Sequence, residues 1–306
     1  MGLAAILVCL LAQHTYPVSG RGPVMEFYGR LCLSAAKRMN TGDRNSGVIA
    51  WSALMGAVLI PVILVSALAA AIHPFLLWLI DIVVLYFTIR FVPTARALGA
   101  LERALREQSA DSAANVLSDW LGEPARADDA SALVRLGAEQ ALREAHYGTF
   151  GPLFWFLVLP GPIGLVMYPL ALRAARTWEL IVDKDERDFG WFAARAFRVI
   201  DWIPQRVSAF FFAVVGNFED ALFCWRSQAA AWLVPDDGIV LASGAGALGV
   251  RLGDPIAAAG ATISRPTLGT GEPASEEVLS SLEGMLWRAM TLWLIVFALA
   301  AALQLA

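Results

Sequence analysis

Four long stretches without a charged residue constrain the fold of this chain more than any other feature. Residues 1–20, 45–80, 145–172 and 289–306 contain no Asp, Glu, Lys or Arg. A helix needs about 20 apolar residues to cross the hydrocarbon core of a membrane. The chain is 58% hydrophobic and 16% charged, whereas soluble domains are about 25% charged. The sequence therefore predicts an all-α, polytopic integral membrane protein with about four to six membrane elements.

Several of these elements have more than one interpretation. The 45–80 window is long enough for nearly two spans, and His73-Pro74 is a natural break between them. The shorter charge-free stretch 207–218 is either a further membrane element or a buried helix. The N-terminal MGLAAILVCLLAQ lacks the positive flank and the cleavage site of a signal peptide, which favours an uncleaved span or a membrane-dipping helix. Asp81 interrupts an apolar run, either as a functional carboxylate, as a residue near one membrane face or as the partner of a neighbouring helix.

The polar segments set the expected topology. Residues 14–46, 91–149 and 173–206 carry most of the Lys and Arg, which places all three in the cytoplasm. The last two flank one charge-free window, with Pro160-Gly161-Pro162 at its centre. A re-entrant hairpin that turns there would return the chain to the same side. The alternative is a proline-kinked helix that crosses once.

The domain organisation follows from the same pattern. We expect one membrane domain over residues 1–306, with an insertion of amphipathic cytoplasmic helices at 91–149. A Gly/Pro-rich loop region at 236–283 precedes the C-terminal span. The net charge of −4 argues against nucleic-acid partners.

General catalytic and metal-binding motifs are absent. The sequence has no GxxxxGK[ST], HExxH or GxSxG, and its three histidines and three cysteines have no ligand spacing. Free thiols suit a reducing cytoplasm. GAGALG (244–249) matches a dinucleotide fingerprint, but no βαβ unit surrounds it. Glycines that pack closely against another backbone explain it better.

A second glycine-rich stretch, GVRLGDPIAAAGATISRPTLGTGEP (249–273), carries Arg251, Asp254 and Arg265. Glycine lets backbone amides approach an anion, and arginine offers paired donors to phosphate or carboxylate. The stretch is therefore either an anion-binding site or a surface loop.

Four ordered blocks of the sequence resemble a known family. They are YPVSGRGPVMEFYGRL near the N-terminus, GPLFWF (151–156), DKDERDFGWFAAR with DWIPQR, and GALGVRLGDP with RPTLGTGEP. Together they resemble the CobD/CbiB family of cobalamin-biosynthesis membrane proteins, and in part the related AmpE proteins. The third block includes the six consecutive charges Asp183–Asp188.

The resemblance implies an activity and a site. Family enzymes join adenosylcobyric acid to aminopropanol or its phosphate and consume ATP, in the manner of an adenosylcobinamide-phosphate synthase. The implied catalytic residues are Asp185 and Glu186, and the implied cofactors are ATP and Mg²⁺. The implied substrate-binding residues are Lys184, Arg187, Arg206, Arg251, Asp254 and Arg265. The implied setting is the bacterial inner membrane, with the lipid bilayer, a corrinoid and other cobalamin-pathway proteins as partners.

Two polar motifs of that family are replaced here. Its E-N-x-S-D-G corresponds to Arg143–Gly148, and its N-T-L-D-x-M-x-G-Y corresponds to Ala175–Asp183. AmpE proteins also lack these motifs. The alternative function is therefore a non-catalytic, AmpE-like membrane signalling or accessory protein. A transporter is a third possibility, but no inverted repeat is visible.

Overall fold

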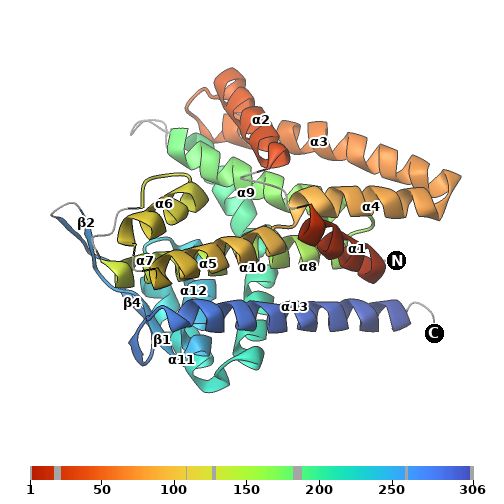
Figure 1. The fold of residues 1–306 in the computed structure, drawn as a ribbon. Coiled ribbons are helices and arrows are strands. Elements are labelled where there is room, and N and C mark those ends of the chain that lie inside the picture. Colours follow the sequence, from red (N-terminus) through yellow and green to blue (C-terminus); the bar gives the residue numbers. More distant parts are fainter. Residues whose placement is uncertain are drawn as a thin grey trace. The chain divides into compact units, whose positions relative to one another are not determined.

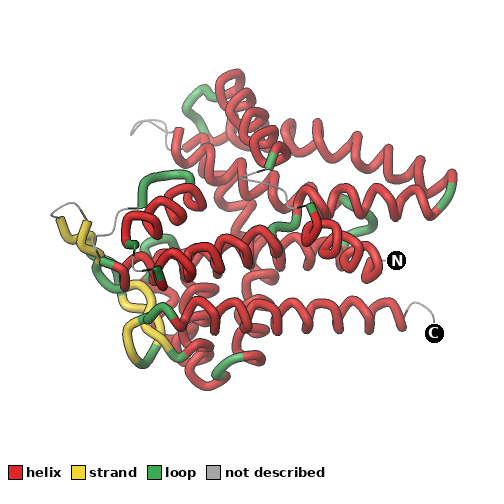
Figure 2. The backbone as a smooth tube through the Cα atoms, in the orientation of Figure 1, coloured by secondary structure: helices red, strands yellow, loops and turns green. Residues whose placement is uncertain are grey.

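The computed structural model describes residues 2–16, 22–107, 109–125, 129–181, 188–258 and 261–303. It is mainly helical (Figures 1 and 2), which confirms the predicted fold class. The helices are α1 (Gly2–Thr15), α2 (Pro23–Met39), α3 (Arg44–Ile72), α4 (Pro74–Thr88), α5 (Phe91–Arg106), α6 (Ala110–Leu121), α7 (Ala130–Ala145), the π-helix η1 (His146–Phe150), α8 (Gly151–Val158), α9 (Ile163–Ile181), α10 (Asp188–Val215), α11 (Phe218–Gln228), the 3₁₀-helix η2 (Ala229–Ala231), α12 (Pro235–Leu248) and α13 (Glu277–Leu303). The strands are β1 (Val250–Gly253), β2 (Ile256–Ala258), β3 (Ala261–Ile263), β4 (Thr267–Gly269) and β5 (Glu272–Pro273).

Three helical stretches among the described residues are long and apolar enough to cross a membrane. They are Arg44–Ile72, Pro74–Arg106 and Glu277–Leu303, and Gly2–Thr15 is a shorter apolar helix. The chain is therefore a multi-pass membrane protein. The windows 145–172 and 207–218 do not supply a candidate span of this kind. The window 145–172 forms η1, the short helix α8 and the start of α9. The window 207–218 lies mainly in the second half of α10.

The break predicted at His73-Pro74 is confirmed. α3 ends at Ile72 and α4 begins at Pro74, and the two helices pack side by side (Figure 1). The Nδ1 atom of His73 accepts a hydrogen bond from the backbone N–H of Phe75 at 3.1 Å. This contact caps the first turn of α4, where proline needs no hydrogen bond of its own. His73 is thus a structural residue of the turn.

The Pro160-Gly161-Pro162 segment reverses the chain. A Cβ atom at Gly164 would lie 2.3 Å from the carbonyl oxygen of Trp155, and one at Gly151 would lie 2.3 Å from the ring of Tyr168. Earlier residues of α8 therefore face later residues of α9, which is the pairing of an antiparallel helical hairpin. Gly161 takes a φ of 61° in the turn, a conformation that favours glycine. The backbone reversal agrees with the hairpin, one of the two alternatives, while its position in a membrane stays a prediction.

Asp81 lies in α4 close to this turn. Its side chain is 8% exposed, and a Cβ atom at Gly161 would lie 3.8 Å from its Oδ1 atom. Ser66 of α3 borders the same turn. The buried position fits contact with neighbouring helices better than a place at an open membrane face.

The packing of the chain divides it into two compact units. One contains the residues up to Ile89, Gly148–Pro204 and the residues from Phe297 onward; the other contains Arg90–Tyr147 and Gln205–Val296. Both are built from segments that are distant in the sequence. The single domain expected over 1–306 stays a prediction.

Small elements replace the Gly/Pro-rich loop expected at 236–283. β1 pairs antiparallel with β4 and parallel with β5, and β2 pairs antiparallel with β3. GAGALG lies at the C-terminal end of α12 and not between a strand and a helix. A Cβ atom at Gly246 would lie 2.4 Å from the carbonyl oxygen of Asp220 in α11, and one at Gly244 would lie 2.6 Å from Leu142 of α7. The close-packing interpretation of these glycines is confirmed.

The three cysteines are free and buried. Burial raises the pKa of the Cys32 thiol to about 11, although the nearby Arg173 acts in the opposite direction. A raised pKa keeps the thiol neutral below that value, so at about pH 8 roughly one thousandth of it is the reactive thiolate. We expect no reaction of Cys32 with N-ethylmaleimide in the folded protein, as measured by intact mass.

The matched control is Leu33→Cys, because Leu33 is next in α2 and its side chain is 41% exposed. This variant should gain one maleimide adduct under the same conditions. Rapid modification of Cys32 in the wild type at about pH 8 would contradict the buried position of α2.

Candidate functional site

The described residues that the sequence singled out belong to one compact unit. Arg251 and Asp254 lie in and just after β1, and Arg265 lies just before β4. Arg206 lies in α10 and is half-buried. Lys184, Asp185, Glu186 and Arg187 lie outside the described residues, so their predicted roles stay predictions.

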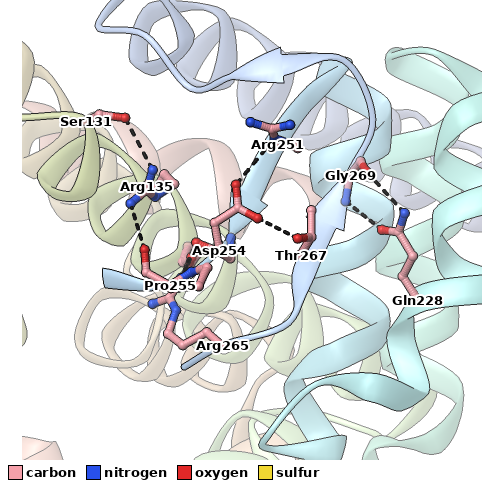
Figure 3. A network of polar contacts seen from close by, with 11 residues as sticks. Ser131, Arg135, Gln228, Arg251, Asp254, Pro255, Arg265, Thr267 and Gly269 are labelled. Carbon is pink, nitrogen blue, oxygen red and sulfur yellow. Dashed lines mark hydrogen bonds and ion pairs between the residues drawn. The ribbon is translucent and has the colours of Figure 1, made fainter. Parts of the chain in front are cut away.

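A local ion pair stabilises the segment that contains β1. Arg251 lies 3.3 Å from Asp254, measured from Nε to Oδ2, and Asp254 accepts a hydrogen bond from Thr267 of β4 at 2.5 Å. Figure 3 shows these contacts together. The side chain of Arg251 is 42% exposed. Asp254 therefore orients a guanidinium group that solvent or a ligand can reach.

Arg265 makes a buried contact with Glu139 of α7. The pair is an ion pair, and its side chains are 9% and 1% exposed. Arg265 also donates to the carbonyl oxygen of Gly253 at 2.9 Å, and the N–H of Gly253 donates to Glu139 at 3.0 Å. The guanidinium lies 5.3 Å from the centre of the Trp232 ring. These contacts join the glycine-rich strand segment to α7.

Glycine is required where the segment meets this pair. Gly253 takes a φ of 72°, and a Cβ atom there would lie 2.2 Å from the carbonyl oxygen of Pro266. A side chain would push β1 away from β4. The glycine therefore permits the close approach that brings its N–H to Glu139.

One face of α7, continued into η1, carries a row of polar residues. Ser131, Arg135, Glu139, Arg143 and Tyr147 follow one another at intervals of four, and this spacing puts them on one side of a helix. Arg135 donates to Ser131 at 3.3 Å and to the carbonyl oxygen of Pro255 at 3.4 Å (Figure 3). Arg135 and Glu139 were not predicted as site residues, although their four-residue spacing is visible in the sequence.

The far end of the row meets α12. The carboxylate of Asp237 lies 3.7 Å from Arg143 and accepts a hydrogen bond from the Tyr147 hydroxyl at 2.9 Å. Gln205 of α10 donates to the carbonyl oxygen of Asp236. Arg143 and Tyr147 occupy positions where the resembling family has a different polar motif. The replacement has produced a connected polar cluster here, and not an apolar one.

The remaining members of the replaced motif also have partners within the protein. Glu144 accepts hydrogen bonds from Thr94 at 2.9 Å and from Arg90 at 3.4 Å. His146 Nδ1 lies 2.9 Å from the Ser208 hydroxyl, and both side chains are fully buried. The π-helix η1 begins at this histidine, and such turns are frequent at functional sites.

The network keeps unused hydrogen-bonding capacity. Glu139 Oε2, Arg135 Nε and Arg265 Nε are buried and have no hydrogen-bond partner among the described residues. Three guanidinium groups (Arg135, Arg251, Arg265) face two carboxylates (Asp254, Glu139) in this part of the unit. The excess of positive charge suits an anionic ligand such as phosphate or carboxylate.

A magnesium site is not formed by the described residues. Within those ranges no three His, Cys, Asp or Glu side chains lie close enough to hold a metal ion together. Three of the four acids of the charge run, Asp183, Asp185 and Glu186, lie outside them, while Asp188 is described and forms an ion pair with Arg44. We therefore derive no step through magnesium.

Apolar spans and a buried arginine–carboxylate network define a multi-pass membrane protein with an internal polar site. The family model described as CobD/Cbib protein matches residues 2–286, so the chain belongs to the CobD/CbiB family. The resemblance of the four sequence blocks is thereby confirmed.

Individual proteins named CobD or CbiB are similar to this chain in sequence. The chain is 30% identical to the cobalamin biosynthesis protein CobD of Stutzerimonas stutzeri, over 88% of each chain. It is 33% identical to the CobD of Chromobacterium violaceum, over 78% of each chain. It is 27% identical to the cobalamin biosynthesis protein CbiB of Salmonella choleraesuis, over 93% of this chain and 91% of that protein. No solved structure matches.

Proposed function

We propose that this protein acts in cobalamin biosynthesis as an enzyme of the adenosylcobinamide-phosphate synthase type. It would join the carboxyl group of adenosylcobyric acid to the amine of aminopropanol or its phosphate, and ATP would activate the carboxyl group. The observation that carries the proposal is the excess of guanidinium groups around the glycine-rich strands, on a chain of this family.

The arginines would bind the anionic groups of the substrates. Arg251 is the accessible one, held by Asp254, and it would pair with phosphate oxygens. Arg265 is buried and would act indirectly, by holding Gly253 and the strands in place. Lys184 and Arg187 would add positive charge, and Asp185 and Glu186 would serve as general base or as magnesium ligands.

Genetic complementation tests the proposal. A bacterial strain without its cobinamide-forming enzyme, supplied with cobyric acid, should regain cobalamin-dependent growth when it expresses this protein. Arg251→Gln should weaken substrate binding on the order of 10- to 100-fold, because a charge-assisted hydrogen bond contributes about 1.5–3 kcal/mol. Arg226→Gln, in an exposed position of α11, is the matched control and should complement like the wild type.

Immunoblots of the membrane fraction establish that each variant is present at equal amounts. A well-expressed wild-type protein that fails to restore growth would rule out the enzymatic function. Equal growth with Arg251→Gln and with wild type, at limiting cobyric acid, would remove Arg251 from the site.

A second candidate function is a non-catalytic, AmpE-like accessory or signalling protein. It is favoured by the partners of the replaced motif, since Glu144 and Tyr147 already bond to protein groups. Such a protein would fail in the complementation and would still change cobalamin output when expressed beside a functional synthase. We place either function in the bacterial inner membrane, with a corrinoid or other cobalamin-pathway proteins as partners.

A further inference from the structure

The first half of α10 has an exposed face that combines arginine with large apolar side chains. Its exposed members are Trp191, Arg195, Arg198, Val199, Trp202 and Ile203, which we call the α10 face. Their spacing of three or four residues places them along one side of the helix. Val199 is 68% exposed and Trp202 56% exposed. This is a large apolar surface to leave in contact with water.

The opposite side of the same helix is fixed in its own unit. Phe197 is buried, and its ring lies 5.4 Å from that of Tyr168 in α9. Asp201 is also buried and accepts a hydrogen bond from the Tyr168 hydroxyl at 2.7 Å. These contacts fix the rotation of α10 about its own axis. The α10 face therefore points away from the packed side of the helix.

A hollow lies in this face. Its volume is about 460 Å³, and it is lined by Arg195, Arg198, Val199, Trp202 and Ile203. Arg198 Nε reaches the carbonyl oxygen of Ala194 in its own helix at 3.4 Å. No described carboxylate forms an ion pair with either arginine. Within the described ranges, two positive charges therefore border an apolar hollow without a carboxylate paired to them.

This combination is suited to the boundary between membrane and water. α10 is not among the candidate spans, but the part of the chain that the structure describes contains three of them. Tryptophan concentrates at the level of the lipid headgroups, and arginine extends its charge toward phosphates while its stem stays on apolar atoms. At that depth the anion present in large number is the phosphate of an anionic lipid.

We propose that the α10 face binds the headgroup of an anionic phospholipid. The phosphate would lie between the guanidinium groups of Arg195 and Arg198, and Trp202, Val199 and Ile203 would contact the apolar part of the lipid. The site is separate from the arginine–carboxylate network, and the proposal does not depend on the enzymatic function.

Native mass spectrometry of the full-length protein in detergent tests the proposal. The protein is offered equal amounts of phosphatidylglycerol and phosphatidylcholine. Wild type should retain phosphatidylglycerol preferentially, and Arg195→Gln/Arg198→Gln should lose roughly 30-fold in that preference, since each arginine contributes about 1 kcal/mol near an anionic surface. Both positions are exposed, so the fold should be unchanged, as checked by circular dichroism.

Arg103→Gln/Arg106→Gln is the matched control, because it removes the same charge from exposed positions of α5. It should keep the wild-type preference. An unchanged preference in Arg195→Gln/Arg198→Gln would overturn the proposal. Displacement of the lipid by millimolar inorganic phosphate would overturn the lipid source in favour of a free anion. Dimers that disappear in the same variant, with unchanged lipid adducts, would assign the face to a second copy of the chain.

Discussion

Replacement of Glu139 by glutamine is expected to lower the free energy of unfolding by about 3 kcal/mol. The side chains of Glu139 and Arg265 are 1% and 9% exposed. Loss of the carboxylate would leave the Arg265 guanidinium buried without its counter-charge, and removal of one partner of a buried pair costs about 3–5 kcal/mol. The carbonyl oxygen of Gly253 would remain as an acceptor for Arg265. We therefore expect a cost at the low end of this range.

Thermal unfolding of the detergent-purified protein measures this effect. The control is Glu102→Gln, which breaks the Glu102–Arg106 pair on α5, where Arg106 is 63% exposed. Its expected cost is below about 1 kcal/mol. The double variant Glu139→Leu/Arg265→Met should recover at least half of the loss, because no charge then remains buried. Equal effects of Glu139→Gln and Glu102→Gln would show that the pair is not buried in solution.

Replacement of Trp178 by alanine is expected to destabilise the other compact unit by about 3–5 kcal/mol. Trp178 is fully buried in α9, with its ring 4.9 Å from that of Phe189. Its indole N–H donates to the carbonyl oxygen of Cys32 in α2 at 2.9 Å. Alanine would leave a cavity at the contact between these helices and would remove this hydrogen bond.

Leu180→Ala is the control for this variant, since Leu180 lies two residues further along α9 and is 86% exposed. It should change stability by less than about 0.5 kcal/mol. Hydrogen exchange of α2 and α9 distinguishes the cases, because only Trp178→Ala should speed exchange there. Unchanged exchange in Trp178→Ala would contradict the packing of α9 on α2.

Trp178 also shows the structural role of one position in a replaced family motif. It stands where the resembling pattern has an aspartate, and Glu179, the acid that follows it, is exposed at the end of α9. The motif has become part of the packing between helices. Restoring the aspartate would bury a carboxylate in an apolar environment. We therefore expect Trp178→Asp to unfold this unit and not to restore a catalytic function.

Features governed by neighbouring residues were predictable from the sequence. Apolar runs predicted α3, α4 and α13, and His73-Pro74 predicted the break between α3 and α4. The prolines around Gly161 indicated the chain reversal between α8 and α9. These depend on backbone geometry and on the length of a span, which a short window of sequence contains.

Features governed by distant residues were not predictable in this way. Glu139 and Arg265 are 126 residues apart, and nothing in either segment specifies the partner. The short strands between Val250 and Pro273 were expected as a loop, because their glycines and prolines disfavour regular strands. β1 packs on α7 and α12, and β4 packs on α12, and only the folded chain supplies these contacts.

The interleaving of the two compact units has a consequence for the evolution of the gene. The coding sequence enters and leaves the first unit repeatedly, and the second unit occupies the intervals between its segments. No single cut in the reading frame releases either unit whole, so recombination cannot exchange one as a module. Natural variation in this gene is therefore expected to accumulate by substitution, as at Arg143–Gly148 and Ala175–Asp183, and not by gain or loss of either unit.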